Sequence, residues 1–280
     1  MTEPADPPEM RVFAVANQKG GVGKTTTAIN LGTALAAVGE AVLIIDIDPQ
    51  GNASTGLGVP RIQRHTTVYD VLVNERPIED ACVATAIPRL EVIPSDPDLS
   101  GLETELASVQ RRSYRLRDTL TGPRARGRWT YVLIDCPPSL NLLTVNAMTA
   151  ADAVFVPLQC EFFALEGLSQ LTRTVDMVRA SLNPSLHIQG VVLTMYDRRN
   201  NLSEQVAQDV RQHFGDTVYD TVIPRNVRVS EAPSYGKPAI IYDFKSAGSQ
   251  AYLRLATEVI ARERRRDRKP PPADLSEGAA

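Results

Sequence analysis

The sequence predicts an α/β fold in which helices cover both faces of a mostly parallel, twisted sheet and a phosphate-binding loop follows the first strand. The chain has 280 residues, of which 43% are hydrophobic and 22% charged, and this is enough for one α/β domain with a full core. Short β-branched apolar runs alternate with helical patterns, as expected for a parallel sheet buried on both faces. A glycine-rich segment joins the first run to the first helix.

The individual elements follow from hydrophobic periodicity. Strands are expected at 11–16, 41–46, 90–94, 130–135, 153–158, 188–195 and 218–223. Helices are expected at 26–38, 104–121, 141–150, 164–182, 201–214 and 247–265. The helix at 201–214 begins with Asn201-Leu202-Ser203-Glu204, which resembles a capping box. One apolar face of the last helix consists of Tyr252, Leu255, Ala256, Val259 and Ile260.

The domain organisation is expected to be simple. Residues 10–266 are expected to form one domain, residues 1–9 a flexible extension, and residues 267–280 a disordered proline-rich tail. No apolar run reaches the roughly 18 residues that a membrane span needs, and the acidic start is not typical of a signal peptide. The three cysteines are widely separated, which favours reduced thiols in a cytoplasmic protein and provides no metal-ligand spacing. They are Cys82, Cys136 and Cys160.

The glycine-rich segment is a deviant Walker A motif, because position 18 is glutamine where the general P-loop pattern has glycine. Its glycines allow the backbone to aim N–H groups at phosphate oxygens, and the following helix N-terminus adds its dipole. Lys24 is expected to reach the β and γ phosphates, and Thr25 to bind Mg²⁺. The predicted nucleotide-binding residues of the loop are Gly20, Gly21, Val22, Gly23, Lys24, Thr25 and Thr26.

A second lysine, Lys19, stands five positions before Lys24. Its side chain is expected to leave the loop on the side away from the phosphates bound there. We therefore expect it to act catalytically on a nucleotide held by a second subunit, as an arginine finger does. The alternative is a solvated surface lysine.

Three aspartates follow apolar strands. Asp46 and Asp48 lie at the carboxyl end of the run 41–46, where open α/β sheets place their ligands, and alternation puts both carboxylates on one side. Asp135 ends another strand and is predicted to be the Walker B aspartate, which binds the Mg²⁺ shell through water. The alternative for Asp48 is a helix cap.

Over residues 10–262 the chain resembles the ParA/Soj chromosome-partitioning ATPases, within the deviant Walker A group that includes MinD and the nitrogenase iron protein. The motifs that carry the resemblance are Lys19 to Thr26, Asp46 to Asn52, Val132 to Ser139, and Ile223 to Pro233. Residues 147–159 and 194–200 further resemble the alphaproteobacterial members.

The resemblance implies roles for several residues. Asp48 positions or activates the attacking water, and Asp46 helps to form the Mg²⁺ shell. The segment Pro224, Arg225 and Asn226 lies against the adenine of ATP or ADP, with Tyr196 and Asp197 as the other wall. An amide such as Asn226 can both donate to and accept from a base. The alternative for this segment is a structural turn.

The charge distribution bears on a DNA partner. The net charge is −3, but residues 262–269 hold six basic and two acidic side chains, and the rest of the chain carries −7. This segment is either a DNA element or a solvated helix end. The resemblance places nonspecific DNA contacts in two loops that follow strands, and phosphate neutralisation needs no base reading. The predicted DNA contacts are Arg198, Arg199, Arg225 and Arg228, and the alternative is surface ion pairing.

The resemblance, together with the P-loop and Lys19, implies a slow switch ATPase. ATP and Mg²⁺ join two subunits, the homodimer binds double-stranded DNA nonspecifically at the nucleoid, and a ParB-type centromere-binding partner stimulates hydrolysis. A MinD-like membrane ATPase is the main alternative, but it needs a terminal amphipathic helix with bulky apolar residues. A nitrogenase-like reductase needs cysteines that bridge a cluster, and a small-molecule kinase does not need Lys19.

Overall fold

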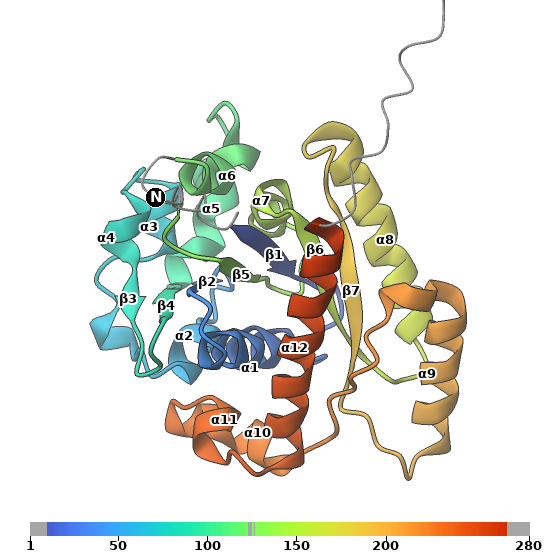
Figure 1. Cartoon of the computed structure of the whole chain (residues 1–280). Helices are drawn as coiled ribbons and strands as arrows, with labels where there is room; N and C mark the ends of the chain where they lie inside the picture. Colours follow the sequence, from blue (N-terminus) through green and yellow to red (C-terminus); the bar gives the residue numbers. More distant parts are fainter. Residues whose placement is uncertain (1–9, 123–124, 126, 268–280) are drawn as a thin grey trace, which may run out of the picture.

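A seven-stranded sheet forms the centre of the computed structural model, which describes residues 10–122, 125 and 127–267 (Figure 1). The strand order is β3-β4-β2-β5-β1-β6-β7, and every pairing is parallel except that of the edge strand β3. The strands are β1 (Arg11–Val15), β2 (Val42–Asp46), β3 (Val83–Ala84), β4 (Leu90–Ile93), β5 (Tyr131–Asp135), β6 (Ala153–Gln159) and β7 (His187–Thr194). The predicted fold class is confirmed.

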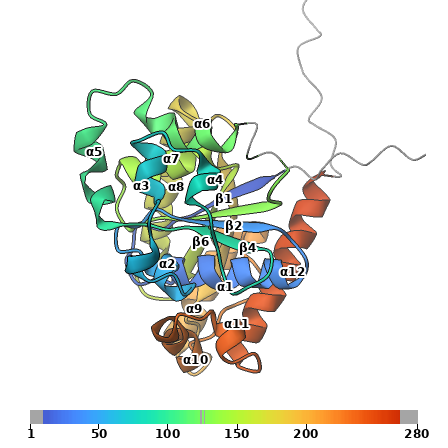
Figure 2. The same cartoon turned by 90° about the vertical axis from the view of Figure 1, so that its left-hand side faces the viewer.

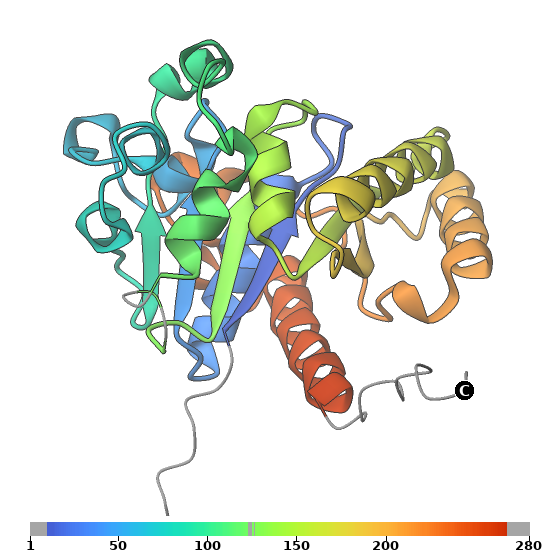
Figure 3. The ribbon, with the colours of Figure 1, turned by 90° about the horizontal axis from the view of Figure 1, so that it is seen from above.

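Helices cover both faces of the sheet, as Figures 2 and 3 show from two further directions. One face is covered by α1 (Lys24–Ala37), α2 (Asn52–Gly56), α10 (Val227–Glu231), α11 (Ala239–Tyr242) and α12 (Ala247–Asp267). The other face is covered by α3 (Val68–Leu72), α4 (Ile78–Ala81), α5 (Leu102–Glu105), α6 (Arg115–Leu120), α7 (Leu142–Ala150), α8 (Ala164–Ser181) and α9 (Asn201–Phe214). Short 3-10 turns lie at Arg61–Gln63, Pro97–Gly101, Arg112–Tyr114, Gly215–Thr217 and Ala232–Tyr235.

The alternation of side chains along β1 explains why two separate cores form. Val12 and Ala14 pack into the core beneath α7 and α8, whereas Phe13 and Val15 pack into the core beneath α1 and α12. All four side chains are buried, so both faces of the strand are apolar, as expected in a parallel sheet. No helix in the described part of the chain is long and apolar enough to cross a membrane.

The predicted strand 218–223 is not a strand of the sheet. Val218 forms only an isolated bridge with Val191, and the backbone N–H groups of Asp220 and Thr221 donate to the carboxylate of Glu258 on α12. These donors are therefore occupied by a helix side chain. Tyr219 and Ile223 still donate to the carbonyls of Val191 and Leu193 on β7, but the N–H groups between them bind Glu258, and the strand is interrupted.

Two helix predictions also differ from the structure. The expected helix 104–121 is divided into α5, a 3-10 turn and α6, and Arg111 between them has a φ of +57°, which no helix can contain. The capping box at the start of α9 is absent, because Asn200 is the N-cap and the carboxylate of Glu204 accepts from the hydroxyl of Tyr196. The tail beyond residue 267 and the extension 1–9 lie outside the described residues.

Candidate nucleotide site and basic cavity

The sheet order brings the predicted phosphate and metal residues together. Strand β5 lies between β2 and β1, and Asp135 of β5 is in register with Asp46 of β2 and Val15 of β1. The loop that follows Val15 therefore begins beside both carboxylates. The sequence-predicted P-loop and acidic residues meet at one edge, where parallel strands end.

The P-loop has the backbone that its glycines permit. Gly21 and Gly23 have φ values of +75° and +89°, and a side chain at either position would be strained. Helix α1 begins at Lys24 directly after this turn. The ammonium of Lys24 donates to the carbonyl of Lys19 at 3.0 Å, which closes the loop around the space in front of the helix. Burial lowers the pKa of Lys24, and the nearby carboxylate of Asp135 opposes this shift.

The side chain of Lys19 contacts a residue outside that loop. Its ammonium forms an ion pair with Glu161 at 2.6 Å, and the two side chains are 38% and 46% exposed. The backbone before it is held in place, because Asn17 accepts from the Lys19 N–H and donates to the carbonyl of Pro157. Gln18, which replaces the usual glycine, donates to Thr174 on α8. Hydrogen bonds of Asn17 and Gln18 therefore hold the loop in place, and the ammonium of Lys19 is accessible from outside.

Asp46 and Asp135 form a fully buried carboxylate pair. Ser54 donates to one oxygen of Asp46 through its N–H (2.7 Å) and its hydroxyl (2.6 Å), whereas the other Asp46 oxygen and both Asp135 oxygens have no hydrogen-bond partner among the described residues. Burial raises the pKa of Asp46 to about 6 and the pKa of Asp135 well above its usual range. Repulsion from Asp46 adds to the shift of Asp135, and Thr25 and Lys24 oppose it.

Unpartnered buried carboxylate oxygens fit a divalent cation, because they cost free energy unless a charge or donor compensates them. Thr25, at the start of α1, lies near enough to Asp135 to oppose the rise in its pKa, although it forms no hydrogen bond with that carboxylate. Within the described residues, no cluster of three or more His, Cys, Asp or Glu side chains could hold a metal by itself. The pair of Asp46 and Asp135 suits Mg²⁺, which keeps several waters and takes few protein carboxylates.

Asp48 is not a helix cap. Its carboxylate accepts from the N–H of Gln50 at 3.0 Å, while the N-cap of α2 is Gly51, which has no side chain that could accept from the helix N–H groups. The carbonyl of Asp48 accepts from the hydroxyl of Ser95. Arg64 holds the same loop from outside by donating to the carbonyls of Gly51 (3.2 Å) and Ser95 (3.1 Å).

A cavity of about 100 Å³, called the base cavity below, lies at the segment that the resemblance implies for the base. Pro224, Arg225 and Asn226 line it as expected. The side-chain amide oxygen of Asn226 accepts from the N–H of Val229, which makes Asn226 the N-cap of α10. Tyr196 and Asp197 do not line this cavity. Its other wall consists of Gly23, Thr26, Thr194, Met195, Ile223, Val229, Ser230 and Tyr252.

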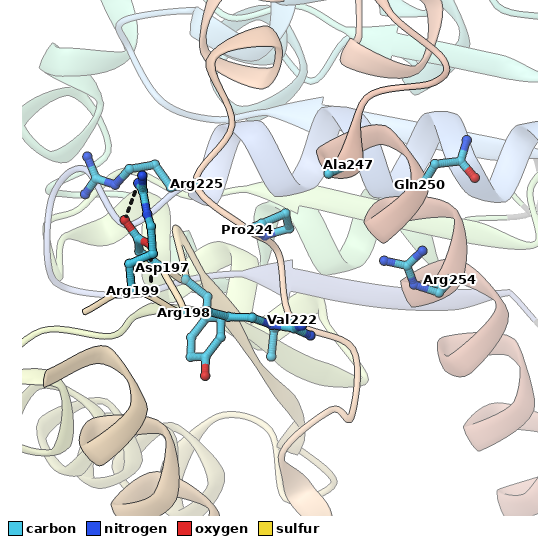
Figure 4. Close-up of a pocket in the computed structure, with 10 residues that line it drawn as sticks. Asp197, Arg198, Arg199, Val222, Pro224, Arg225, Ala247, Gln250 and Arg254 are labelled. Atoms are coloured by element: carbon cyan, nitrogen blue, oxygen red, sulfur yellow. Dashed lines mark hydrogen bonds and ion pairs between the residues drawn. The ribbon is translucent and has the colours of Figure 1, made fainter. Parts of the chain in front are cut away.

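A third feature is the basic cavity, a hollow of about 540 Å³ that lies beside the base cavity (Figure 4). Its lining residues are Tyr196, Asp197, Arg198, Arg199, Val222, Pro224, Arg225, Ala247, Gln250 and Arg254. Backbone bonds hold its two loops together, because Tyr196 donates to the carbonyl of Ile223 and accepts from the N–H of Arg225, both at 3.0 Å.

The predicted DNA arginines are only partly gathered in this cavity. Arg198, Arg199 and Arg225 line it, but Arg228 lies on α10 and pairs with Glu231 (3.2 Å) and Asp243 (3.4 Å). Arg199 is also paired, and its hydrogen bonds lower the pKa of Asp197 to about 2. Surface ion pairing, the alternative weighed above, is therefore present at two of the four positions.

One arginine of the basic segment 262–269, Arg262, forms contacts within the fold. Arg262 donates to the carbonyls of Thr217 and Val218 and lies over the ring of Tyr219, 4.0 Å from its centroid. Arg268 and Lys269 lie outside the described residues.

Sequence reasoning missed the residues that support the site. Ser54, Arg64 and Ser95 lie 8, 13 and 47 residues from Asp46, Gly51 and Asp48, the residues they bind, and nothing in their local pattern marks them. Met195 has a φ of +50°, which a methionine rarely adopts, but this strain is visible only in the structure.

Comparisons with known proteins agree with this geometry. Residues 10–188 match the AAA domain family. The chromosome partitioning protein ParA of Caulobacter vibrioides is 75% identical over 260 residues, which cover 93% of this chain and 97% of that protein. The sporulation initiation inhibitor protein Soj of Bacillus subtilis is 53% identical over 251 residues, or 90% of this chain and 98% of that protein.

Solved structures give the same picture. A cobyrinic acid a,c-diamide synthase from Mycobacterium smegmatis with bound ADP and magnesium has a TM-score of 0.80 and 37% identity, and the match covers 95% of this chain and all of that one. The septum site-determining protein MinD of Pyrococcus horikoshii, complexed with Mg-ADP, has a TM-score of 0.74 and 28% identity, with 90% and 96% covered.

Proposed function

The chain belongs to the ParA/Soj family of chromosome-partitioning ATPases, and we propose that it is a switch whose ATP-bound homodimer binds DNA without sequence preference. A ParB-type centromere-binding protein stimulates its slow hydrolysis and so releases it from the DNA. The observation that carries this proposal is that an accessible Lys19 occurs together with a P-loop and the buried carboxylates Asp46 and Asp135.

The nucleotide site supports ATP and ADP with Mg²⁺ as cofactors. The backbone of Gly20 to Thr26 and the ammonium of Lys24 would hold the phosphates, and Thr25, Asp46 and Asp135 would hold the Mg²⁺ shell. When bound, the metal ion neutralises phosphate charge. Lys24 is already turned into the loop, and the unpartnered oxygens of Asp46 and Asp135 supply the negative charge that a cation needs.

Asp48 supports hydrolysis by its position rather than by its acidity. Its carboxylate projects from the loop after β2, beside the buried pair, and keeps one oxygen free of the bond to Gln50. The loop around it is held by Ser95 and Arg64, so the carboxylate can orient a water against the γ-phosphate.

Lys19 supports the dimer. A cation directed away from the phosphates of its own subunit can act only on a group brought by another molecule, and a γ-phosphate across a two-fold interface is such a group. Dimerisation therefore depends on ATP, because ADP lacks the γ-phosphate that Lys19 would contact. DNA binding would place the ATP-bound form on the nucleoid in the cytoplasm.

A membrane-associated, MinD-like function has less support. It requires a terminal helix with bulky apolar residues on one face. The last described turn of α12 instead carries Arg264, Arg265 and Arg266.

The experiment is DNA binding of the purified protein without nucleotide, with ADP and with ATP, each with Mg²⁺. Binding only with ATP is expected, and random DNA sequences should bind equally well. Lys24→Ala should remove nucleotide binding and DNA binding together, whereas Lys19→Ala should keep nucleotide binding in the monomer and lose the dimer. Equal DNA binding in all three nucleotide states would refute the switch.

A further inference from the structure

The basic cavity has a wall from α12 that none of the predicted DNA contacts includes. Ala247, Gln250 and Arg254 line it from this helix, three and four residues apart, so they share one helical face. Figure 4 shows Arg254 on α12 across the cavity from Arg225 and Arg199. The cavity is therefore bounded by the two loops on one side and by a long helix on the other.

The positive charge of this cavity is largely uncompensated. Among the described residues, the side chains of Arg198, Arg225 and Arg254 form no hydrogen bond or ion pair, and all three are exposed. The one acidic side chain in the lining, Asp197, is bound by Arg199 at 2.9 Å. Like charges in one hollow repel each other, so the arrangement favours a ligand with several negative charges.

We propose that the basic cavity holds backbone phosphates of double-stranded DNA and that Arg254 is a phosphate-binding residue opposite the loop arginines. Positive charge then lies on both sides of the bound strand. This inference rests on the proposed function, but it adds a contact that neither the motifs nor the basic segment 262–269 predicted.

The chemistry of the lining favours backbone phosphates over bases. Phosphate contacts need only a positive charge within reach, whereas base reading needs donors and acceptors held in fixed geometry. Arg198, Arg225 and Arg254 are exposed and unsupported by neighbours, so they suit the first task. The one aromatic ring in the lining, Tyr196, is held by Glu204 through its hydroxyl.

The test measures DNA affinity against salt concentration for the full-length protein with ATP and Mg²⁺. Arg254→Gln removes the charge, and Arg254→Lys keeps it. The matched control is Arg76→Gln, which makes the same charge change at an exposed position between α3 and α4, away from the cavity lining. Nucleotide-dependent dimerisation and the melting temperature are measured for each variant and should not change, because Arg254 has no partner within the described chain.

Arg254→Gln should bind DNA more weakly, and each lost phosphate contact should flatten the slope of log K against log salt by about 0.9. When the salt concentration rises from 50 to 200 mM, the affinity of the wild type should fall by a certain factor. For a variant that lacks one phosphate contact, this factor should be about 3.5-fold smaller. Arg254→Lys should keep the wild-type slope, and so should Arg76→Gln.

Two results would overturn the assignment. A slope for Arg254→Gln that equals those of wild type and Arg76→Gln would show that Arg254 touches no phosphate, while ATP-dependent binding by wild type would leave the switch intact. If inorganic tripolyphosphate binds wild type but not Arg254→Gln in calorimetry, and the DNA slope of the variant is unchanged, the cavity serves a small polyanion instead. Absence of ATP-dependent DNA binding by wild type would refute the proposed function itself.

Discussion

Glu161 is expected to compete with the second subunit for Lys19, so Glu161→Gln should strengthen ATP-dependent dimerisation. Both partners of the Lys19–Glu161 pair are more than one-third exposed, and pairs of this kind contribute at most about 1 kcal/mol. A dimer that engages Lys19 from both subunits breaks two such pairs. At about 0.2–1 kcal/mol for each pair, the dissociation constant should therefore fall by a factor between about 2 and 30.

The assay is sedimentation equilibrium with a non-hydrolysable ATP analogue, because hydrolysis would otherwise distort the dimer fraction. The control is Glu166→Gln. It removes a carboxylate that lies near Lys19 but accepts a hydrogen bond from Gln170 instead. In a Lys19→Ala background, the Glu161 substitution should have no effect, since the interaction it removes is already absent. The advantage should also shrink at high salt.

Weaker dimerisation of Glu161→Gln would refute this reasoning, because it would mean that the carboxylate itself binds across the interface. The reasoning would also be refuted if Glu161→Gln had no effect on dimerisation at low salt, or if its effect persisted without Lys19.

Three further outcomes are expected. Asp48→Ala should stay dimeric with ATP but lose hydrolysis, which sizing chromatography and phosphate release can check, and elution as a monomer would contradict the role of Asp48. Burial raises the folded-state pKa values of Asp46 and Asp135, that of Asp46 to about 6. The metal-free protein should therefore lose stability as the pH rises from about 4 through about 6. Asp46→Asn should reduce this loss, which thermal melts can measure. Gly190→Ala should cost about 1–3 kcal/mol in urea unfolding, because the new Cβ would lie 2.4 Å from the ring of Tyr219, which is fully buried; an unchanged midpoint would show that the ring can move.

Much of the nucleotide site could be predicted because its determinants are local or follow from strand direction. Positive φ values at Gly21 and Gly23 require glycine, and the P-loop sequence provides it. Asp46 and Asp135 each end an apolar run, and parallel strands end at the same edge of a sheet. Their proximity therefore follows from the pattern of strands and helices, without knowledge of any side-chain contact.

Other features depend on which distant segments pack together. The run 218–223 has the composition of a strand, but Glu258 on α12 takes two of its N–H groups. Glu204 has the spacing of a capping box, but Tyr196 from the preceding loop binds it. In each case a local propensity of a fraction of a kcal/mol competes with a hydrogen bond to a charged group of about 1.5–3 kcal/mol, and the long-range contact prevails.

The basic cavity shows the same division most clearly. The spacing of 247, 250 and 254 places these residues on one face of a helix, and the arginines at 198 and 225 follow predicted strands. Periodicity describes each segment separately, so it carries no information on which helical face meets which loop. That arrangement is set by the packing of α12 against α1 and the sheet, where the burial of Tyr252, Leu255 and Val259 fixes the rotation of the helix and leaves Arg254 facing the cavity.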